Sequence, residues 1–182
     1  MSKTGIFMAN GCEEIEGLTV VDLLRRAGLD IEMISINETT EVTGSHGITF
    51  LADTLFENVN FDELDAVALP GGMPGTLNLG GHAGVVSVIQ KFADEGKLVA
   101  AICAAPSVLG AAGILNGKHA VCYPGFEEKL NGAIVSEDTV MTDGNVITSR
   151  SMGTAIDFAL AIVKYFKGED AAADLKQNLV YR

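Results

Sequence analysis

Residues 98–109 constrain the fold of this chain more than any other stretch. An unbroken apolar run, Leu98 to Ile102, is followed by Cys103, two alanines and Pro106. An apolar strand without polar alternation is typical of a parallel sheet that is covered on both faces, and proline is favoured in the first turn of a helix. The stretch therefore predicts a buried strand that passes without a linker into a helix.

Cys103 lies at this junction and has two interpretations. Unpaired backbone N–H groups and the positive end of a helix dipole favour the thiolate, which would make the cysteine reactive. Most free cysteines are instead small buried hydrophobic residues. The stretch alone favours neither interpretation.

Strand-like and helix-like segments alternate along the chain. Short apolar runs predict strands, and amphipathic runs predict helices. The predicted strands span residues 5–9, 31–36, 64–69, 98–102, 120–123, 133–135, 140–142 and 146–148, and the predicted helices span about 13–27, 85–96, 104–113, 154–166 and 169–179. This order predicts a flavodoxin-like α/β fold, in which helices sandwich a doubly wound, mostly parallel sheet.

Two β-hairpins are also predicted. Residues 39–51 contain Gly44 and Gly47 between arms rich in Thr, Ile and Phe, so we expect a hairpin excursion from the main sheet. Asp143-Gly144-Asn145 is a strong turn signal between strands 140–142 and 146–148. With 182 residues and no internal repeat or linker, the chain is expected to form a single domain over residues 1–182.

Composition argues against several classes of partner and site. The formal net charge is −12 and Lys and Arg form no basic stripe, so neither nucleic acid nor an anionic membrane is an expected partner. No apolar run approaches the roughly 20 residues that span a bilayer and no signal peptide is recognisable, so we expect a cytoplasmic protein. The three cysteines show no disulfide or zinc spacing, and the glycines show no nucleotide-binding spacing, so we expect neither metal nor cofactor.

The carboxyl ends of the strands form the ligand crevice in a sheet of this kind. This rule gathers residues 10–16, 70–75, 103–105 and 123–124 around one pocket. Glu16 can then be the partner of Cys103 if strands 5–9 and 98–102 are neighbours. A productive pair needs Glu16 protonated, because a carboxylate and a thiolate raise each other's pKa. A solvated carboxylate is the alternative, and it is the preferred interpretation of Glu13 and Glu14.

Backbone N–H groups at the same edge could stabilise an oxyanion. Gly71, Gly72 and Ala104 are the candidates, although Gly71-Gly72 could also be a simple turn. Cys12 and Cys122 fall on the same rim of the sheet. Each is either a thiol that resolves an oxidised Cys103 as a disulfide or a half-buried small residue.

Histidines give little sign of a Cys–His pair or a metal site. A cysteine hydrolase usually uses a histidine base, and the residue after Cys103 is Ala104. His46 lies in the predicted hairpin, His82 at a helix start and His119 at the foot of a strand. We therefore expect all three histidines to be structural or exposed.

Four segments together resemble the DJ-1-like branch of the DJ-1/PfpI (ThiJ/PfpI) superfamily. They are Gly11-Cys12-Glu13-Glu14-Ile15-Glu16, Leu69-Pro70-Gly71-Gly72, Ala100-Ala101-Ile102-Cys103-Ala104-Ala105-Pro106, and Thr148-Ser149-Arg150 before Gly153-Thr154-Ala155-Ile156-Asp157-Phe158-Ala159. The resemblance spans essentially the whole chain in the same order. It implies a flavodoxin-like homodimer with a readily oxidised nucleophile at Cys103, a protonated Glu16, and an oxyanion site formed by the N–H groups of Gly72 and Ala104.

The sequence departs from the family pattern at three positions. Tyr123 precedes Pro124 where many relatives have a pocket histidine, so Tyr123 becomes a candidate for hydrogen bonding to substrate. The family's Arg-Gly-Pro-Gly loop is Arg150-Ser151-Met152-Gly153, which makes Arg150 and Met152 candidates at the pocket rim. His46 stands where the hairpin often carries arginine, and in a dimer it could reach the neighbour's pocket.

The resemblance implies several activities. We expect a cofactor-independent glyoxalase or deglycase that acts on a small carbonyl substrate such as methylglyoxal through Cys103. The alternative is a redox-sensing stress protein or chaperone that responds through oxidation of Cys103. A peptidase ranks below these because Ala104 stands where the peptidase branch has a histidine. The thiazole-biosynthesis role attached to bacterial members also ranks below them.

Overall fold

Seven strands form the central sheet of the computed structural model, which describes residues 2–182. Their spatial order is β10 (Val140–Asp143), β11 (Val146–Ser149), β7 (Leu98–Ile102), β6 (Ala66–Leu69), β1 (Lys3–Met8), β2 (Asp30–Ser35) and β5 (Thr54–Leu55). Neighbouring strands are parallel, except that β10 and β11 form the antiparallel hairpin predicted around Asp143-Gly144-Asn145. The predicted doubly wound, mostly parallel sheet is confirmed.

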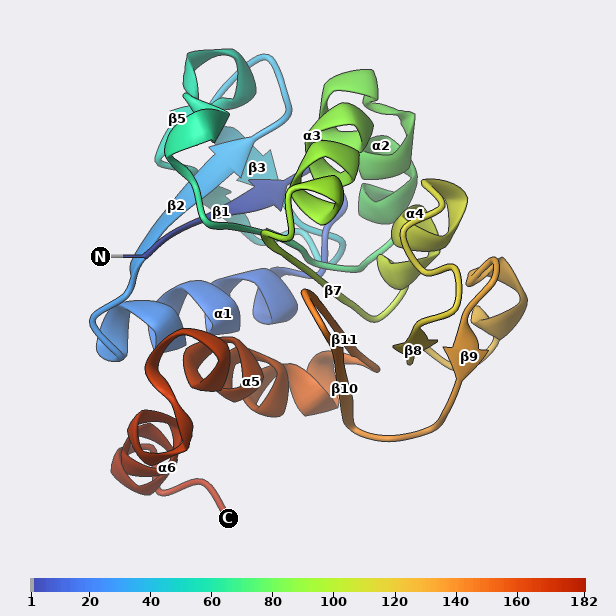
Figure 1. The fold of residues 1–182 in the computed structure, drawn as a ribbon. Helices are drawn as coiled ribbons and strands as arrows, with labels where there is room; N and C mark the ends of the chain where they lie inside the picture. Colours follow the sequence, from blue (N-terminus) through green and yellow to red (C-terminus); the bar gives the residue numbers. More distant parts are fainter. Residues whose placement is uncertain (1) are drawn as a thin grey trace.

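Helices cover both faces of this sheet (Figure 1). On one face lie α1 (Glu14–Arg26) and α5 (Ala155–Lys167), with α6 (Glu169–Asn178) packed on α5, and on the other lie α2 (Gly75–Gly81), α3 (Ala83–Asp94) and α4 (Pro106–Ala111). Alternate residues of a strand point to opposite faces. Met8 therefore packs in the core on the α1 and α5 side, while its neighbour Phe7 packs in the core on the other side, and both are fully buried.

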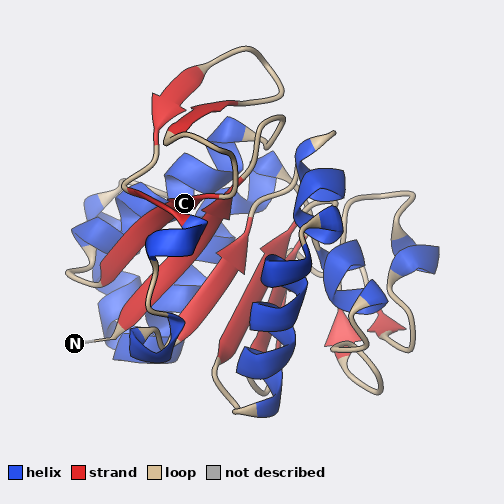
Figure 2. Cartoon of the chain, turned by 90° about the horizontal axis from the view of Figure 1, so that it is seen from above, coloured by secondary structure: helices blue, strands red, loops and turns tan. Residues whose placement is uncertain are grey.

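Two small sheets lie outside the main one. β3 (Glu41–Thr43) and β4 (Thr49–Leu51) form the predicted hairpin, which projects from the carboxyl-terminal end of the sheet (Figure 2). β8 (His119–Ala120) and β9 (Ile134–Val135) form a parallel pair. Four short 3-10 helices complete the structure at η1 (Phe56–Asn58), η2 (Phe61–Glu63), η3 (Glu127–Lys129) and η4 (Met152–Thr154).

The predicted strand 120–123 is wrong in extent, because strand pairing ends at Ala120. The next backbone groups bond elsewhere: Val121 N–H donates to Thr148 Oγ1 at 3.0 Å, and Tyr123 N–H donates to the carbonyl oxygen of Cys103 at 2.8 Å. These bonds attach the segment to the end of β11 and to the turn that holds Cys103.

Helix α2 is not predicted by the sequence pattern, since its seven residues include three glycines. Burial of Leu79, which is 0% exposed, stabilises it against the unfavourable helix propensity of glycine. Among residues 2–182, no helix has both the length and the apolar character needed to cross a bilayer.

Candidate active site

Cys103 occupies a sharp turn between β7 and α4. Its φ is 66°, in the left-handed region that residues with a side chain rarely adopt. Hydrogen bonds hold the turn on both sides, from Cys103 N–H to the Ser149 carbonyl at 3.0 Å and from Tyr123 N–H to the Cys103 carbonyl at 2.8 Å. Because α4 begins only at Pro106, the cysteine lies before the helix rather than in its first turn.

Glu16 is buried beside Cys103 with only 1% of its surface exposed. Its side chain is hydrogen-bonded to that of Cys103, and Oε2 accepts the Gly71 N–H at 2.8 Å. The condition that the two strands be neighbours is not met, because β6 lies between β1 and β7. The pair nevertheless forms, since the loop after β6 places Gly71 against both side chains.

Burial raises the pKa of Glu16 from 4.5 to about 7, although N–H groups of Gly71 and Met152 and the Cys103 side chain oppose the rise. Burial and the Glu16 carboxylate also raise the pKa of Cys103, while N–H groups of Gly72 and Ala104 lower it. The net effect is a raised pKa for Cys103, whereas the N-terminus of a helix would lower it. Two negative charges are disfavoured here, so the pair loses its first proton only near pH 7 and keeps the second proton well above that pH.

Glycine is required at positions 71 and 72 because Gly71 approaches the pair, and Gly72 approaches the backbone before α1, too closely for a side chain. A Cβ atom at Gly71 would lie 2.6 Å from Cys103 Cβ and 2.8 Å from Glu16 Oε2. At Gly72, where φ is 87°, a Cβ atom would lie 2.2 Å from the backbone nitrogen of Glu13. The bare backbone lets the Gly72 N–H reach the Cys103 sulfur, beside the N–H of Ala104.

A cavity of about 480 Å³ opens over Cys103. Its lining includes seven of the ten predicted site residues, namely Glu16, His46, Gly72, Cys103, Ala104, Tyr123 and Met152. Five lining residues were not predicted as site residues, namely Glu13, Ser45, Met73, Phe126 and Ser151. His46 thus contributes to the cavity of its own chain.

Three predicted pocket residues lie outside this lining. Cys12 is fully buried, Gly71 lies behind the Glu16–Cys103 pair, and Arg150 Nη1 donates to the Glu137 carbonyl at 3.4 Å. Cys12, Cys103 and Cys122 are all free thiols. Burial raises the pKa of Cys12 to about 12 and that of Cys122 to about 11, which keeps both thiols protonated.

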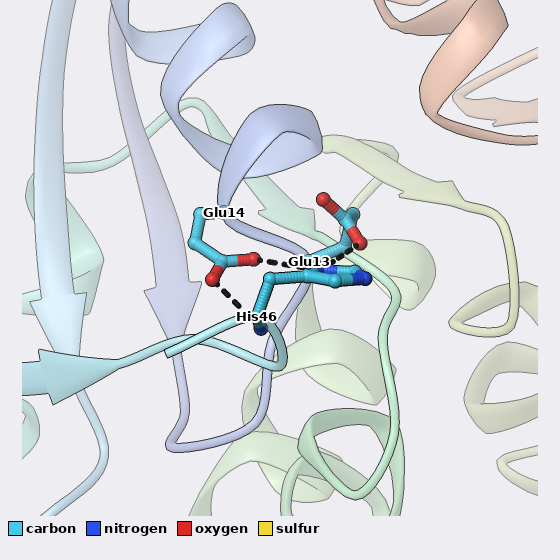
Figure 3. A group of neighbouring side chains, drawn as sticks. All are labelled: Glu13, Glu14 and His46. Carbon is cyan, nitrogen blue, oxygen red and sulfur yellow. Dashed lines mark hydrogen bonds and ion pairs between the residues drawn. The ribbon is translucent and has the colours of Figure 1, made fainter. Parts of the chain in front are cut away.

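Glu14 is not the solvated helix partner that was expected, because it is 1% exposed. Its Oε1 accepts the N–H of His46 at 2.9 Å and that of Ile48 at 3.3 Å, so the carboxylate holds the turn of the β3–β4 hairpin (Figure 3). Burial raises the pKa of Glu14, but these N–H groups and its own N–H lower it by more, so the pKa lies below its ordinary value. Gly44 makes this approach possible, since a Cβ atom there would lie 2.2 Å from Glu14 Cδ.

Two carboxylates approach the same nitrogen of His46. Glu13 Oε2 lies 3.2 Å and Glu14 Oε2 lies 3.4 Å from His46 Nδ1 (Figure 3). Among residues 2–182, this is the one group of three side chains whose ligand atoms, all within 4.8 Å of one another, could hold a metal ion. Both carboxylates also accept hydrogen bonds from backbone N–H groups of the helix or hairpin. Hydrogen bonds within the protein therefore explain why the three side chains lie together.

Comparisons with known proteins agree with this architecture. The sequence profile of the DJ-1/PfpI family matches residues 2–165. This chain belongs to the DJ-1/PfpI family. Among its DJ-1 relatives, dj-1beta of Drosophila melanogaster is 37% identical over 99% of this chain and 98% of its own length. The crystal structure of that protein superimposes with a TM-score of 0.95 at 36% identity over 100% of both chains.

Further members of the DJ-1/PfpI family carry more specific descriptions. A protein of Pyrococcus abyssi named a deglycase is 35% identical over 89% of this chain and 98% of its own length. An oxidised DJ-1 of Toxoplasma gondii has a TM-score of 0.96 at 34% identity, covering 100% of this chain and 99% of its own. The chain spans only 42% of the DJ-1 homolog B of Arabidopsis thaliana, which is 37% identical to it.

Proposed function

We propose that the protein is a cofactor-independent enzyme that uses Cys103 to convert small α-oxoaldehydes, such as methylglyoxal, into 2-hydroxy acids. The observation that carries this proposal is the buried Glu16–Cys103 pair beside two backbone N–H donors in an open cavity. A nucleophile, a proton carrier and an oxyanion site are the groups that addition to an aldehyde requires. The deglycase name of the Pyrococcus abyssi relative supports activity on a carbonyl compound.

The reaction can be written with these groups alone. Sγ of Cys103 adds to the aldehyde carbon, and the proton of the pair moves to the aldehyde oxygen, which the N–H groups of Gly72 and Ala104 hold. Glu16 then removes the hydrogen on that carbon and returns a proton to the neighbouring carbon, while the hydroxyl proton on the first carbon passes to the carbonyl oxygen of the neighbouring carbon. These two transfers leave a thioester of the 2-hydroxy acid. Water hydrolyses the thioester, and the Cys103 thiol is restored. A carboxyl pKa of about 7 suits a group that must both accept and donate a proton at neutral pH.

The test measures 2-hydroxy acid formation from a panel of α-oxoaldehydes in buffer free of amines and added thiols, so that direct conversion is separated from deglycation. Cys103→Ala should abolish turnover, and Glu16→Ala should lower kcat/KM by about 10²–10⁴-fold. Cys122→Ala is the matched control, because Cys122 is a buried thiol outside the cavity lining. If the Cys103 and Glu16 variants match the parent protein, the mechanism is wrong.

Redox sensing through Cys103 is the second candidate function, and the surroundings of the sulfur favour it. The Gly72 and Ala104 N–H groups and the Glu16 carboxyl that face Sγ could also hold the oxygens of a sulfinate. The test is intact-mass analysis after mild peroxide treatment. Addition of two oxygens at Cys103, with Cys12 and Cys122 unchanged, supports sensing, whereas an unmodified Cys103 contradicts it. A Cys–His peptidase has no such support, because within residues 2–182 the hydrogen-bond partners of the Cys103 side chain are Glu16, Gly72 and Ala104 and include no histidine.

We also propose that the protein is a homodimer. Three large apolar side chains are exposed close to the hairpin: Ile15 at the start of α1 is 46% exposed, and Ile48 and Leu51 are 51% and 66% exposed. Glu14 binds the Ile48 N–H, which brings the start of α1 and the hairpin together. Exposed apolar residues grouped in this way are typical of surfaces that bind another protein.

A further inference from the structure

The cavity over Cys103 contains a second side chain that can transfer protons. His46 enters the lining from the β3–β4 hairpin. Its ring Nδ1 lies 3.2 Å from Glu13 Oε2, 3.4 Å from Glu14 Oε2 and 3.1 Å from Ser45 Oγ (Figure 3). Within residues 2–182, every hydrogen bond or ion pair of the ring uses Nδ1, so Nε2 is the nitrogen that remains available.

The backbone that carries His46 is fixed to the start of α1. Its N–H donates to the buried Glu14, and the preceding residue Ser45 donates its N–H to the Cys12 carbonyl at 2.7 Å. Gly44 packs directly against the Glu14 carboxyl group. The side chain of His46 is nevertheless 69% exposed, whereas Glu16 is 1% exposed. The two groups therefore differ in access to water, with Glu16 on the buried side of the cavity and His46 on the solvent side.

This difference matches the two kinds of proton transfer in the proposed reaction. The transfer between neighbouring carbons needs a group shielded from water, which fits Glu16. Hydrolysis of the thioester needs a base that contacts water, and a neutral imidazole is the side chain best suited to that at pH 7. A carboxylate that accepts the Nδ1 proton of a histidine keeps the lone pair on Nε2.

We propose that His46 is the general base that activates water for hydrolysis of the Cys103 thioester, and that Glu13 and Glu14 position its ring. This inference rests on the proposed function. The water oxygen bonds to the thioester carbonyl carbon while its proton moves to His46 Nε2. The N–H groups of Gly72 and Ala104 hold the resulting oxyanion. The C–S bond then breaks with its electron pair on Sγ, which regains a proton by way of the imidazolium and solvent. The products are the 2-hydroxy acid and the thiol, without an oxidant or reductant.

The decisive experiment mixes enzyme rapidly with methylglyoxal, quenches with acid, and measures intact mass together with product formation. In His46→Gln the lactoyl thioester should accumulate on Cys103. It should form in a first-turnover burst at the rate seen in the parent protein, while kcat falls by about 10²-fold or more. Added imidazole should restore hydrolysis in His46→Gly. Glu14→Gln should show partial accumulation, because the ring loses one of its positioning carboxylates.

His119→Gln is the matched control. His119 is also exposed, and its Nδ1 lies 3.2 Å from Asp143 Oδ2, but it lies outside the cavity lining. This variant should turn over like the parent protein with no acyl-enzyme detected. Parent-like kcat in His46→Gln overturns the role of His46, and a lower kcat without thioester accumulation overturns the assigned step. If the parent protein forms neither product nor a Cys103 adduct, the proposed function itself fails, and this inference fails with it.

Discussion

Glu14 and Glu16 are two buried carboxyl groups on the first turn of α1, and they should respond to pH in opposite ways. Each is 1% exposed. The pKa of Glu16 is raised to about 7 by burial, whereas that of Glu14 is lowered by N–H groups of the helix and hairpin despite its burial. Replacing each with glutamine keeps size and shape while removing the titration, so stability measured against pH separates the two environments.

The direction in which pH changes stability depends on whether the folded or the unfolded state holds the proton more tightly. Folded Glu16 retains its proton up to about pH 7, while the unfolded group loses it near 4.5, so the folded state loses stability as pH rises between these values. At about 1.4 kcal/mol per pKa unit, the full effect is about 3 kcal/mol. Glutamine does not titrate, so the Glu16→Gln variant does not lose stability in this way as pH rises. Its stability relative to the parent protein should therefore increase by about 2–3 kcal/mol between pH 5 and pH 8.

Glu14 gives the opposite result. Because its folded pKa is depressed, its stabilising contribution is complete above the unfolded value and is lost as pH falls through the folded value. Glu14→Gln should therefore destabilise the protein at pH 5–8, and the difference from the parent should shrink toward pH 3.

Urea or thermal unfolding of the parent and both variants at pH 3, 5 and 8, with the thiols kept reduced, measures these differences. A change of 2–3 kcal/mol corresponds to roughly 5–10 °C in Tm for a chain of this size. If the stability difference for Glu16→Gln is the same at pH 5 and pH 8, the carboxyl group titrates normally in the folded protein. The physical basis of the proposed proton transfer would then be refuted.

Two further predictions concern the hairpin. Gly44→Ala should cost about 1–3 kcal/mol in urea unfolding, because the new Cβ would lie 2.2 Å from Glu14 Cδ, whereas Gly81→Ala, with no atom within 4 Å, should be neutral or stabilising. Equal costs would show that the hairpin can move away from Glu14. Leu51→Glu should convert the proposed dimer to monomers in sedimentation experiments while Leu77→Glu, on α2 and 62% exposed, should not. A dimer that survives Leu51→Glu excludes the hairpin as its interface.

The features predicted correctly from sequence are those determined by short segments. The apolar run of β7 and the position of Pro106 locate the turn of Cys103, and Gly71-Gly72 identifies a loop that approaches it closely. The alternation of elements predicts the sheet. Its strand order is a property of the whole chain, however, and the insertion of β6 between β1 and β7 has no local signature.

The residues assigned wrongly depend on contacts between distant segments. Glu13-Glu14 at a helix start is typical of solvated dipole partners, and only the approach of Gly44, thirty positions along the chain, buries Glu14. Arg150 next to the rim segment Ser151-Met152 suggests a pocket residue, yet the carbonyl of Glu137 takes its side chain away. A glycine flanked by polar residues in the hairpin was the available signal for a close approach, but the sequence does not identify its partner.

The hairpin therefore links stability to the proposed chemistry. Glu14 is buried because the turn of the hairpin supplies the N–H groups that its charge requires, and the same bonds place His46 in the cavity. A neutral residue at position 14 should loosen the turn and disorder the imidazole together, while leaving Glu16 and its bond to the Gly71 N–H intact. Hydrolysis should then be impaired more than addition to the aldehyde. Equal impairment of both steps in Glu14→Gln would mean that the hairpin supports the whole cavity rather than positioning one base.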